Sequence, residues 1–235
     1  MTDTSPYSAA EPRSLAPYIQ HTRISAGLTR DELVAHCEQA AEYGFNAAMV
    51  PASWVPLAVQ VLRGTGVQVA SALDFPTVGV MTSAGKAAEA RSIAEAGADQ
   101  LDIGVQIGWL RSGMHREFAD DIAGVVAAGI PVKVMLELPL LTPAERDLAV
   151  DLAMDAGAAY LKNASSGAIE VANPASVGYL VGRARDGVRV KASGRITGLE
   201  QAVSLLDAGA VLLGTSSGVS IVTGGAGAAA DRSGY

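Results

Sequence analysis

Four lysines are the residues of this chain best suited to covalent chemistry on a carbonyl group. The sequence has 17 lysines and arginines, and only four of them are lysines: Lys86, Lys133, Lys162 and Lys191. A deprotonated lysine amine attacks a carbonyl carbon to form a Schiff base, whereas an arginine guanidinium keeps its proton. Because the chain uses arginine almost everywhere else, these few lysines indicate a particular task.

Three of the lysines stand in short apolar runs that are typical of buried strands. The runs PVKVML, AYLKNAS and VRVKASG contain Lys133, Lys162 and Lys191. Lysine is seldom buried without a partner or a purpose. Burial and a neighbouring cation lower its ordinary pKa of about 10.4 to roughly 7–8, where the amine is available near neutral pH. We expect Lys162 to be the amine with the lowered pKa and Lys191 to be its positive neighbour.

A carboxylate is needed to move protons during the carbinolamine and enamine steps, and Asp102 is the candidate. It stands in QLDIGVQIG, at the end of a predicted strand. The alternatives are that each lysine binds phosphate or pairs with Glu137 or Asp102, and that Asp102 only makes a structural hydrogen bond. Lys133 is expected to pair with one of these two carboxylates as a supporting charge. Lys86 opens a predicted helix, where a surface position is an equally good interpretation.

A recurring sequence pattern predicts the helices and strands that must position these side chains. An Ala-rich amphipathic run, a glycine and a short apolar run follow one another in EQAAEYGFNAAMV, ARSIAEAGADQLDIGV, DIAGVVAAGIPVKVML, DLAMDAGAAYLK and QAVSLLDAGAVLLG. The glycine after each helical run predicts a left-handed helix C-terminus. The apolar runs lack strict alternation, which is typical of parallel strands buried on both faces. The repeated unit therefore indicates an α/β fold.

The predicted strands and helices alternate along the whole chain. The strands are predicted near residues 18–22, 46–50, 67–73, 99–104, 132–137, 159–162, 188–192 and 211–213. The helices are predicted near residues 30–43, 53–63, 83–96, 115–128, 143–156, 174–184 and 198–208, with a short one after Gly218. Eight such units predict a single-domain (β/α)8 TIM barrel over residues 15–223, with a flexible N-terminal segment 1–14 and a flexible Gly-rich tail 224–235. An open doubly wound sheet is the alternative, and the lack of a dinucleotide fingerprint after the first strand weakens it.

The overall charge and the cysteine content exclude several classes of partner. With 24 acidic and 17 basic residues the net charge is −7, which argues against nucleic acid and anionic membrane surfaces as partners. Cys37 is the only cysteine, so an internal disulfide and a multi-cysteine metal site are excluded. The N-terminus lacks the apolar core of a signal peptide, and the uncharged stretch 208–230 is too rich in glycine for a membrane helix. We expect a cytoplasmic protein with no metal and no membrane partner.

Several motifs together resemble the deoxyribose-phosphate aldolase family over about residues 15–223. They are YIQHTRI, YGFNAAMVPASWVPLA, DQLDIGVQIG, VKVMLE, YLKNASSG, VKASGRIT and LLGTSSGVSIV. The resemblance implies a class I aldolase, an aldehyde-lyase that reversibly joins acetaldehyde to glyceraldehyde 3-phosphate without a cofactor. It implies that Lys162 is the Schiff-base nucleophile, that Lys191 perturbs it and that Asp102 is the acid/base. It also implies a homodimer, and a role for Tyr235, because some members end in a tyrosine that assists proton transfer.

The sequence departs from the family where a phosphate would bind. Residues 162–166 read KNASS where KTSTG is common, and Arg195 replaces the second glycine of KASGG. Residues 196–198 read ITG in place of IRT, Gln20 stands where Asp is usual, and Glu170 falls in the loop that should receive a dianion. Because glycine has no side chain, its backbone N–H group can approach a phosphate closely. A side chain at position 195 obstructs that approach, although an arginine could itself bind the phosphate.

The candidate substrate-binding residues follow the ends of the predicted strands. They are Thr22, Lys133, Ser165, Gly194, Arg195, Gly214, Ser216 and Ser217. The GTSSG turn opens the last predicted helix, where it binds an anion or only caps the helix. His21, Trp54, Trp109 and Asp74 are further candidates for the cleft wall.

Three functions remain open. The first is aldol chemistry on a sugar phosphate. The second is the same chemistry on a different, unphosphorylated acceptor, which Arg195, Thr197 and Glu170 favour. The third is a catalytically silent barrel, which the intact Lys162, Lys191 and Asp102 disfavour.

Overall fold

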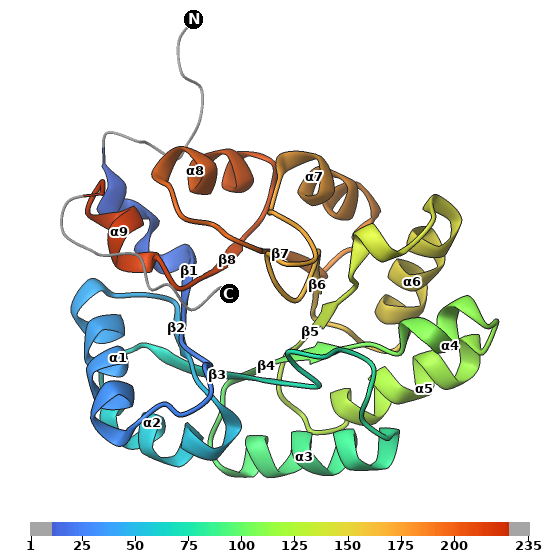
Figure 1. Cartoon of the computed structure of the whole chain (residues 1–235), viewed down its shortest axis with the longest axis horizontal. Coiled ribbons are helices and arrows are strands. Elements are labelled where there is room, and N and C mark those ends of the chain that lie inside the picture. The colour runs from blue at the N-terminus through green and yellow to red at the C-terminus, as the bar shows by residue number, and fades with distance from the viewer. Residues whose placement is uncertain (1–10, 226–235) are drawn as a thin grey trace, which may run out of the picture.

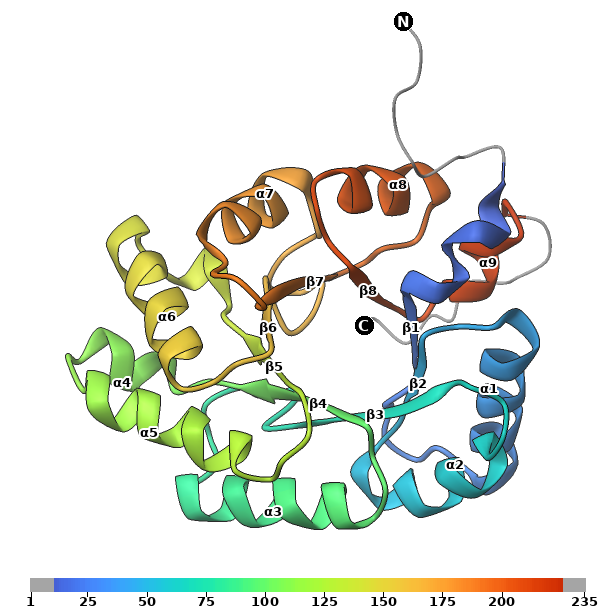
Figure 2. The same cartoon turned by 180° about the vertical axis from the view of Figure 1, so that it is seen from behind.

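The computed structural model describes residues 11–225 of the 235-residue chain. These residues form a closed barrel of eight parallel strands inside a ring of helices (Figures 1 and 2). Neighbouring strands in the chain are neighbours in the barrel, and β8 returns to pair with β1, where Ile19 lies opposite Leu213. The predicted (β/α)8 barrel is confirmed, and the open-sheet alternative is wrong.

The strands are short and the helices cover their outer face (Figure 1). The strands are β1 (Ile19–Thr22), β2 (Ala47–Met49), β3 (Gln68–Leu73), β4 (Gln100–Gly104), β5 (Val132–Met135), β6 (Tyr160–Lys162), β7 (Arg189–Ser193) and β8 (Leu212–Thr215). The α-helices are α1 (Arg30–Tyr43), α2 (Val55–Leu62), α3 (Ser83–Glu95), α4 (Ile107–Arg111), α5 (His115–Val126), α6 (Pro143–Asp155), α7 (Pro174–Arg183), α8 (Leu199–Asp207) and α9 (Gly218–Val222). Three 3-10 helices are η1 (Pro12–Tyr18), η2 (Ala52–Trp54) and η3 (Leu138–Leu140).

Local sequence signals set the boundaries of the helices. Thr29 begins α1 with a capping box, in which its side chain accepts from the Glu32 N–H and Glu32 accepts from the Thr29 N–H. Gly44 ends α1 in the left-handed region at φ 69°. The glycines after the other four repeated helical runs also have positive φ: Gly97, Gly129, Gly157 and Gly209. The glycine-marked helix ends are therefore confirmed.

The structure also contains short elements that the sequence did not predict. η1 begins at Pro12, within the segment 1–14 that the sequence predicted to be flexible. Leu15 and Ala16 in this helix are buried, and η1 packs against α9. Proline at the first helical position has a suitable φ, and the buried side chains hold the turn in place. α4 and η3 were likewise missed, because each is only one turn long and has no amphipathic period to detect.

The barrel interior is divided into an apolar half and a charged half. Most buried apolar residues form one core between the barrel and the helices, but Ala47, Met49 and Ala70 form a separate small cluster on β2 and β3. Across the barrel, the strands from β4 to β7 contribute the buried side chains Asp102, Lys133, Lys162 and Lys191. Alternate residues of a barrel strand point inward, so the register of each strand selects which side chains enter the interior.

Among residues 11–225, the structure has no helix with the length and apolarity required to cross a membrane.

Candidate active site

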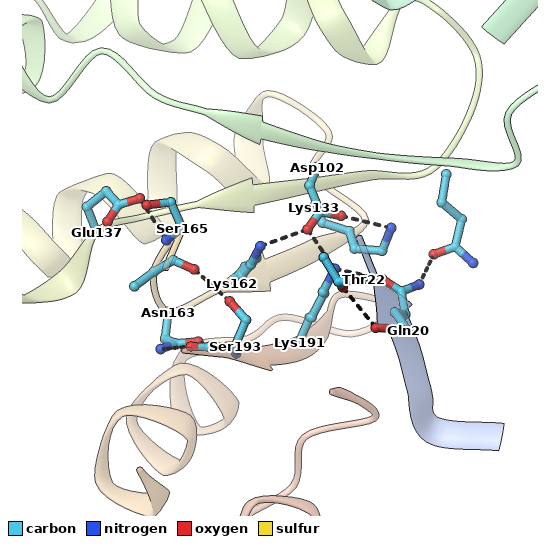
Figure 3. A network of polar contacts seen from close by, with 12 residues as sticks. Gln20, Thr22, Asp102, Lys133, Glu137, Lys162, Asn163, Ser165, Lys191 and Ser193 are labelled. Carbon is cyan, nitrogen blue, oxygen red and sulfur yellow. Dashed lines mark hydrogen bonds and ion pairs between the residues drawn. The ribbon is translucent and has the colours of Figure 1, made fainter. Parts of the chain in front are cut away.

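Asp102 is the centre of a buried cluster that three lysines share (Figure 3). Its Oδ2 atom lies 2.9 Å from Lys162 Nζ and 2.6 Å from Lys191 Nζ, and its Oδ1 atom lies 3.1 Å from Lys133 Nζ. None of the four side chains is more than 1% exposed. The structure thus brings together the three residues for which the sequence predicted catalysis, and adds Lys133 behind the carboxylate.

The parallel register explains why residues so far apart in sequence meet. Asp102 on β4 lies opposite Lys133 on β5, and Lys162 on β6 lies opposite Lys191 on β7. Residues that pair in register on adjacent strands point to the same face of the sheet, so these side chains all enter the barrel interior. Of the two partners expected for Lys133, the structure selects Asp102.

Burial and mutual charge determine the proton affinities of the cluster. Burial alone would raise the pKa of Asp102, but the ammonium groups of Lys162, Lys191 and Lys133 outweigh it and hold the pKa well below its usual range. Burial lowers the pKa of Lys191 well below its ordinary value, against the attraction of Asp102, and the charges of the other two lysines lower it further. Burial also lowers the pKa of Lys133 against the attraction of Asp102, and the charges of Lys162 and Arg189 lower it further.

One carboxylate cannot balance three buried ammonium groups, so the cluster favours the loss of a proton from an amine. The sequence assigned the lowered pKa to Lys162 alone. In the structure the pKa values of Lys191 and Lys133 are lowered. The arrangement places an ionised carboxylate within reach of amines whose pKa is lowered.

Gln20 gives Lys191 a neutral partner in the position where the family usually has a carboxylate. Lys191 Nζ donates to Gln20 Oε1 at 2.7 Å, and Gln20 Nε2 donates to Gln100 Oε1 at 2.8 Å (Figure 3). The amide accepts a hydrogen bond without adding a negative charge, so Asp102 is the carboxylate on which the Lys191 ammonium depends. The hydroxyl of Thr22 donates to the backbone carbonyl of Gln20 and is 2% exposed.

Two side chains fix the loop that follows Lys162. Asn163 donates to the Ser193 carbonyl and accepts from the Ser193 N–H, which ties the β6 loop to β7. Glu137 accepts the Ser165 N–H at 2.8 Å from a left-handed backbone position at φ 51°. Burial raises the pKa of Glu137. Ser165 is itself buried against Glu137, whereas its neighbour Ser166 reaches open space, as do Ala168 and Ile169 of the same loop.

Neighbouring groups crowd the glycine of the expected phosphate site. Gly194 has φ 121°, and a side-chain carbon there would overlap the backbone carbonyl of Glu170. Its own carbonyl accepts the Ala172 N–H at 2.8 Å. Arg195 is exposed and has φ 46°, a left-handed conformation that suits the glycine usual in the family. Its side chain lies against Gly167, where a side-chain carbon would overlap it.

The turn after β8 is only partly free to bind an anion. The Ser217 N–H donates to Thr215 Oγ1 at 2.8 Å, while Ser216 is half-buried. A side-chain carbon on Gly214 would lie 2.9 Å from Lys191 Cε, so glycine at this position makes room for the lysine. Gly214 therefore supports the amine cluster, and Ser216 is the residue of the turn best placed to face a ligand.

An open cavity of about 760 Å³ lies at the mouth of the barrel, and we call it the mouth cavity. It is lined by Thr22, Ile24, Ser25, Ala26, Gly27, Leu28, Pro51, Ser53, Trp54, Phe75, Pro76, Ser166, Ala168 and Ile169. Apart from Thr22, the last residue of β1, these residues belong to the segments that follow β1, β2, β3 and β6 at the carboxyl ends of the strands, where barrel enzymes place their sites. Of the candidate wall residues, Thr22 and Trp54 line the cavity. The sequence missed Phe75 and Ile169, since nothing in a loop marks an apolar residue as exposed to a cavity.

Three other candidates lie elsewhere. His21 stacks on His36 at 4.4 Å between the ring centroids, on the side of β1 that faces α1. Trp109 belongs to α4 and is not among the residues that line the mouth cavity. Asp74 accepts from the backbone N–H groups of Gly79, Val80 and Met81, so it holds its own loop and does not face the cavity.

Lys86 is a fully buried ion-pair residue and not a surface residue. Its Nζ lies 3.0 Å from Asp74 Oδ2 and 2.6 Å from Asp121 Oδ2, and it donates to the Gly104 carbonyl at 2.9 Å. The helical spacing could have indicated that Lys86 is buried, because Lys86 shares the buried face of α3 with Ala90 and Ile93. The surface interpretation failed because lysine is rarely buried, and only the fold brings two carboxylates to it.

Comparison with known proteins gives a consistent set of relatives. The chain is 42% identical over 203 residues to a deoxyribose-phosphate aldolase from Thermosynechococcus vestitus, covering 86% of this chain and 93% of that protein. It is 41% identical to one from Methanothermobacter thermautotrophicus, covering 89% and 94%. Its structure matches the tetrameric deoxyribose phosphate aldolase from Aeropyrum pernix with a TM-score of 0.81 at 30% identity, covering 92% and 97% of the chains. It matches a putative deoxyribose-phosphate aldolase from Coccidioides immitis with a TM-score of 0.83 at 34% identity, covering 92% and 87%. No family model matches the chain.

Proposed function

Because this chain belongs to the deoxyribose-phosphate aldolase family, we propose that it is a Schiff-base aldolase that adds acetaldehyde to an acceptor aldehyde such as glyceraldehyde 3-phosphate. The product with this acceptor is 2-deoxyribose 5-phosphate, and the reverse cleavage uses the same residues. The observation that carries the proposal is the contact of Asp102 Oδ2 with both Lys162 Nζ and Lys191 Nζ. A nucleophilic amine, an acid/base and a second amine that disfavours protonation are the groups that enamine chemistry requires.

In the proposed reaction, the neutral amine of Lys162 attacks the acetaldehyde carbonyl to give a carbinolamine. A proton from the Asp102 and Lys191 pair goes to the hydroxyl group, water leaves, and an iminium forms. Asp102 then removes a proton from the methyl carbon, which gives the enamine. The enamine carbon attacks the acceptor aldehyde, the new alkoxide takes up a proton, and water hydrolyses the iminium to release the product and Lys162.

The low pKa of Asp102 keeps it ionised between steps, so a proton that it takes up passes on readily to a neighbouring amine. The lowered pKa of Lys191 makes its ammonium group a stronger acid, so it gives up a proton more readily. Arg195 and Ser216 are the proposed contacts of an acceptor phosphate, because Arg195 is exposed after β7 and Ser216 is half-buried in the turn after the neighbouring strand β8. Thr22 is proposed to face the reacting aldehydes from β1.

An unphosphorylated acceptor is the second candidate, and the position of Glu170 favours it. The Glu170 carboxylate accepts from Asn163 Nδ2 at 2.6 Å, and its backbone covers Gly194. A negative charge here opposes a phosphate dianion. Cleavage rates of deoxyribose with and without its 5-phosphate separate the two candidates. A large preference for the phosphorylated sugar would rule out the second.

Trapping of the Schiff base tests the chemistry directly. Borohydride reduction with acetaldehyde, followed by peptide mass mapping, should place a two-carbon adduct on the peptide that contains Lys162. The Lys162→Met variant should lose the adduct, while Lys191→Met should keep a site for it but form it more slowly. An adduct on Lys191 in the unmodified protein, or none on either lysine, would contradict the proposal.

We further propose that the chain forms a homodimer and acts in the cytoplasm. Light scattering on the purified chain measures the mass of the assembly, and the dimer is rejected if the mass is that of 23.9 kDa monomers.

Tyr235 lies outside the described residues, so its proposed assistance in proton transfer is tested by removal of that residue alone. A lower rate of exchange of the acetaldehyde methyl protons, with the Lys162 adduct retained, would support it.

A further inference from the structure

We propose that a chain of hydrogen-bonded side-chain amides inside the barrel holds Lys191 Nζ in its place beside Asp102. Gln20 and Gln100 are thereby positioning residues of the aldol reaction, which act through Lys191 and do not touch the substrate. The inference rests on the aldolase function proposed above. We call this group the amide chain, and its members are Gln20, Asn46, Gln68 and Gln100.

The amide chain runs from Lys191 to the amino-terminal edge of the barrel. Lys191 Nζ donates to Gln20 Oε1 at 2.7 Å (Figure 3). Gln20 Nε2 donates in turn to Gln100 Oε1 at 2.8 Å, and Gln100 Nε2 donates to Gln68 Oε1. Gln20 and Gln100 are buried, whereas Gln68, the first residue of β3, is exposed. The chain therefore connects the amine cluster with the end of the barrel opposite the mouth cavity.

The acceptors of the Gln20 NH2 group decide which way its amide points. Besides Gln100 Oε1, this group donates to Asn46 Oδ1 at 3.0 Å. In the reversed orientation the Gln20 oxygen would face these two oxygen atoms, and its NH2 group would face the Lys191 ammonium. Two hydrogen bonds would be lost and a donor would lie against a donor. The amide chain thus stabilises the orientation in which the oxygen faces Lys191.

The barrel leaves a path along which Lys191 reaches Gln20. Gln20 on β1 lies opposite Gly214 on β8, and Lys191 belongs to the next strand, β7. A side-chain carbon on Gly214 would lie 2.9 Å from Lys191 Cε, so glycine lets the lysine extend across β8 toward β1. Gln100 stands two residues before Asp102 on β4, so both side chains enter the same interior. One strand therefore carries both the carboxylate partner of Lys191 and the residue that orients its amide partner.

The amide chain fixes Lys191 without changing the charge of the cluster. The charged side chains that face this amine are Asp102 from β4, Lys133 from β5 and Lys162 from β6, while β1 contributes the neutral Gln20. Burial and the two other ammonium groups lower the pKa of Lys191 against the attraction of Asp102. A carboxylate in place of Gln20 would be a second anion in contact with Nζ, and it would favour the protonated forms of Lys191 and Lys162.

Two substitutions of Gln20 with opposite electrostatic effects test the proposal. Gln20→Glu keeps an acceptor oxygen but adds a charge, so both limbs of the pH profile of kcat/KM for 2-deoxyribose 5-phosphate cleavage should move up by about one to three pH units. Gln20→Met removes the acceptor, so kcat should fall about tenfold to a hundredfold while KM changes less than about threefold. Its alkaline limb should move to lower pH, because the Lys191 ammonium loses an acceptor.

Gln100→Met tests the amide chain itself, because it leaves Gln20 and Lys191 in place. The Gln20 NH2 group loses one of its two acceptors, so kcat should fall about threefold to tenfold, and the alkaline limb should move in the same direction as in Gln20→Met. This variant keeps the test valid if Gln20→Met does not fold. Gln60→Met, at an exposed position of α2, is the matched control and should leave the rate and the pH profile unchanged.

Two results would overturn the proposal. One is that the Met variants, shown to be folded by circular dichroism, lower kcat by the same factor at every pH, which would leave the amides a structural role alone. The other is that Gln20→Glu leaves both limbs of the profile in place. With the Lys162 adduct still formed from acetaldehyde in the unmodified protein, the aldolase function stands and the positioning role fails. If no adduct forms there at all, the aldolase function itself fails and the positioning role with it.

Discussion

At the scale of single residues, the balance of charge around Asp102 governs the behaviour of the cluster. This carboxylate contacts three buried amines, and one of them, Lys191, also donates to Gln20. Removing its charge takes away the anion that the three amines share, so the effect on chemistry should exceed that of losing one hydrogen bond.

The Asp102→Asn variant tests this balance. The amide retains the shape of the side chain but neither accepts protons readily nor offsets the ammonium charges, so kcat for aldol cleavage should fall about 10²–10⁴-fold. Exchange of the acetaldehyde methyl protons, followed by NMR, measures the step in which Asp102 acts as base. Asp120→Asn, at an exposed position of α5, is the control. A fall of less than about threefold in exchange would remove Asp102 from the role of base.

Glu137 acts on chemistry through the loop that follows the nucleophile. Its carboxyl group holds the Ser165 N–H, three residues after Lys162. In Glu137→Ala this buried N–H loses its acceptor, which should cost about 1–3 kcal/mol of unfolding free energy and raise KM for the acceptor. Glu137→Gln keeps an acceptor oxygen and should restore most of both values, as measured by urea denaturation and steady-state kinetics. Equal effects of Ala and Gln would show that the charge matters and the hydrogen bond does not.

At the scale of elements, the buried ion pairs of Lys86 join α3, α5 and the loop after β3. Lys86 contacts Asp121 on α5 and Asp74, which in turn holds the N–H groups of residues 79–81. The same loop presents Phe75 to the mouth cavity. A substitution of Lys86 should therefore affect both the packing of α3 on α5 and the loop that places Phe75 in the wall of the mouth cavity.

Lys86→Met should leave the buried carboxylates of Asp74 and Asp121 without the ammonium group that pairs with them. This should lower the free energy of unfolding by about 3–5 kcal/mol. Guanidinium denaturation followed by circular dichroism measures the loss. Arg116→Met removes an exposed ion pair with Asp120 and is the matched control, with an expected change below about 1 kcal/mol. If the two variants lose equal stability, the buried pairs contribute no more than a surface pair.

At the scale of the whole molecule, stability depends on pH through a histidine buried between β1 and α1. Burial first, then the charges of His21 and Arg23, lower the pKa of His36 well below its ordinary value of 6.5. The folded state therefore binds this proton less readily than the unfolded state does. Stability is fully present above pH 6.5 and is lost as the pH falls from there toward the folded pKa.

The expected loss is on the order of 1 kcal/mol for each pH unit below 6.5. Denaturant titrations between pH 7.5 and pH 5 measure the slope. His36→Gln should flatten it, whereas His115→Gln, at an exposed position of α5, should leave it unchanged. The opposite sign, with stability rising toward pH 5, would mean that His36 is charged in the folded protein.

The sequence by itself determined the architecture of the barrel. Glycines after helical runs and unbroken apolar strands are local signals, because a left-handed helix end and a doubly buried strand each restrict the residue type. Five glycine-marked repeats among eight predicted strands leave few topologies, and parallel strands then direct Asp102, Lys162 and Lys191 to one end. The catalytic candidates could thus be predicted before any distance was known.

Only the tertiary structure decided which partners these residues meet. Register placed Lys133 on Asp102 and not on Glu137, and helix packing turned Lys86 inward to two carboxylates. The apolar mouth cavity and the crowding of Gly194 by Glu170 arise from loops that are distant in sequence. Such contacts depend on angles and distances between elements, which no local pattern encodes, and they determine which acceptor the proposed nucleophile meets.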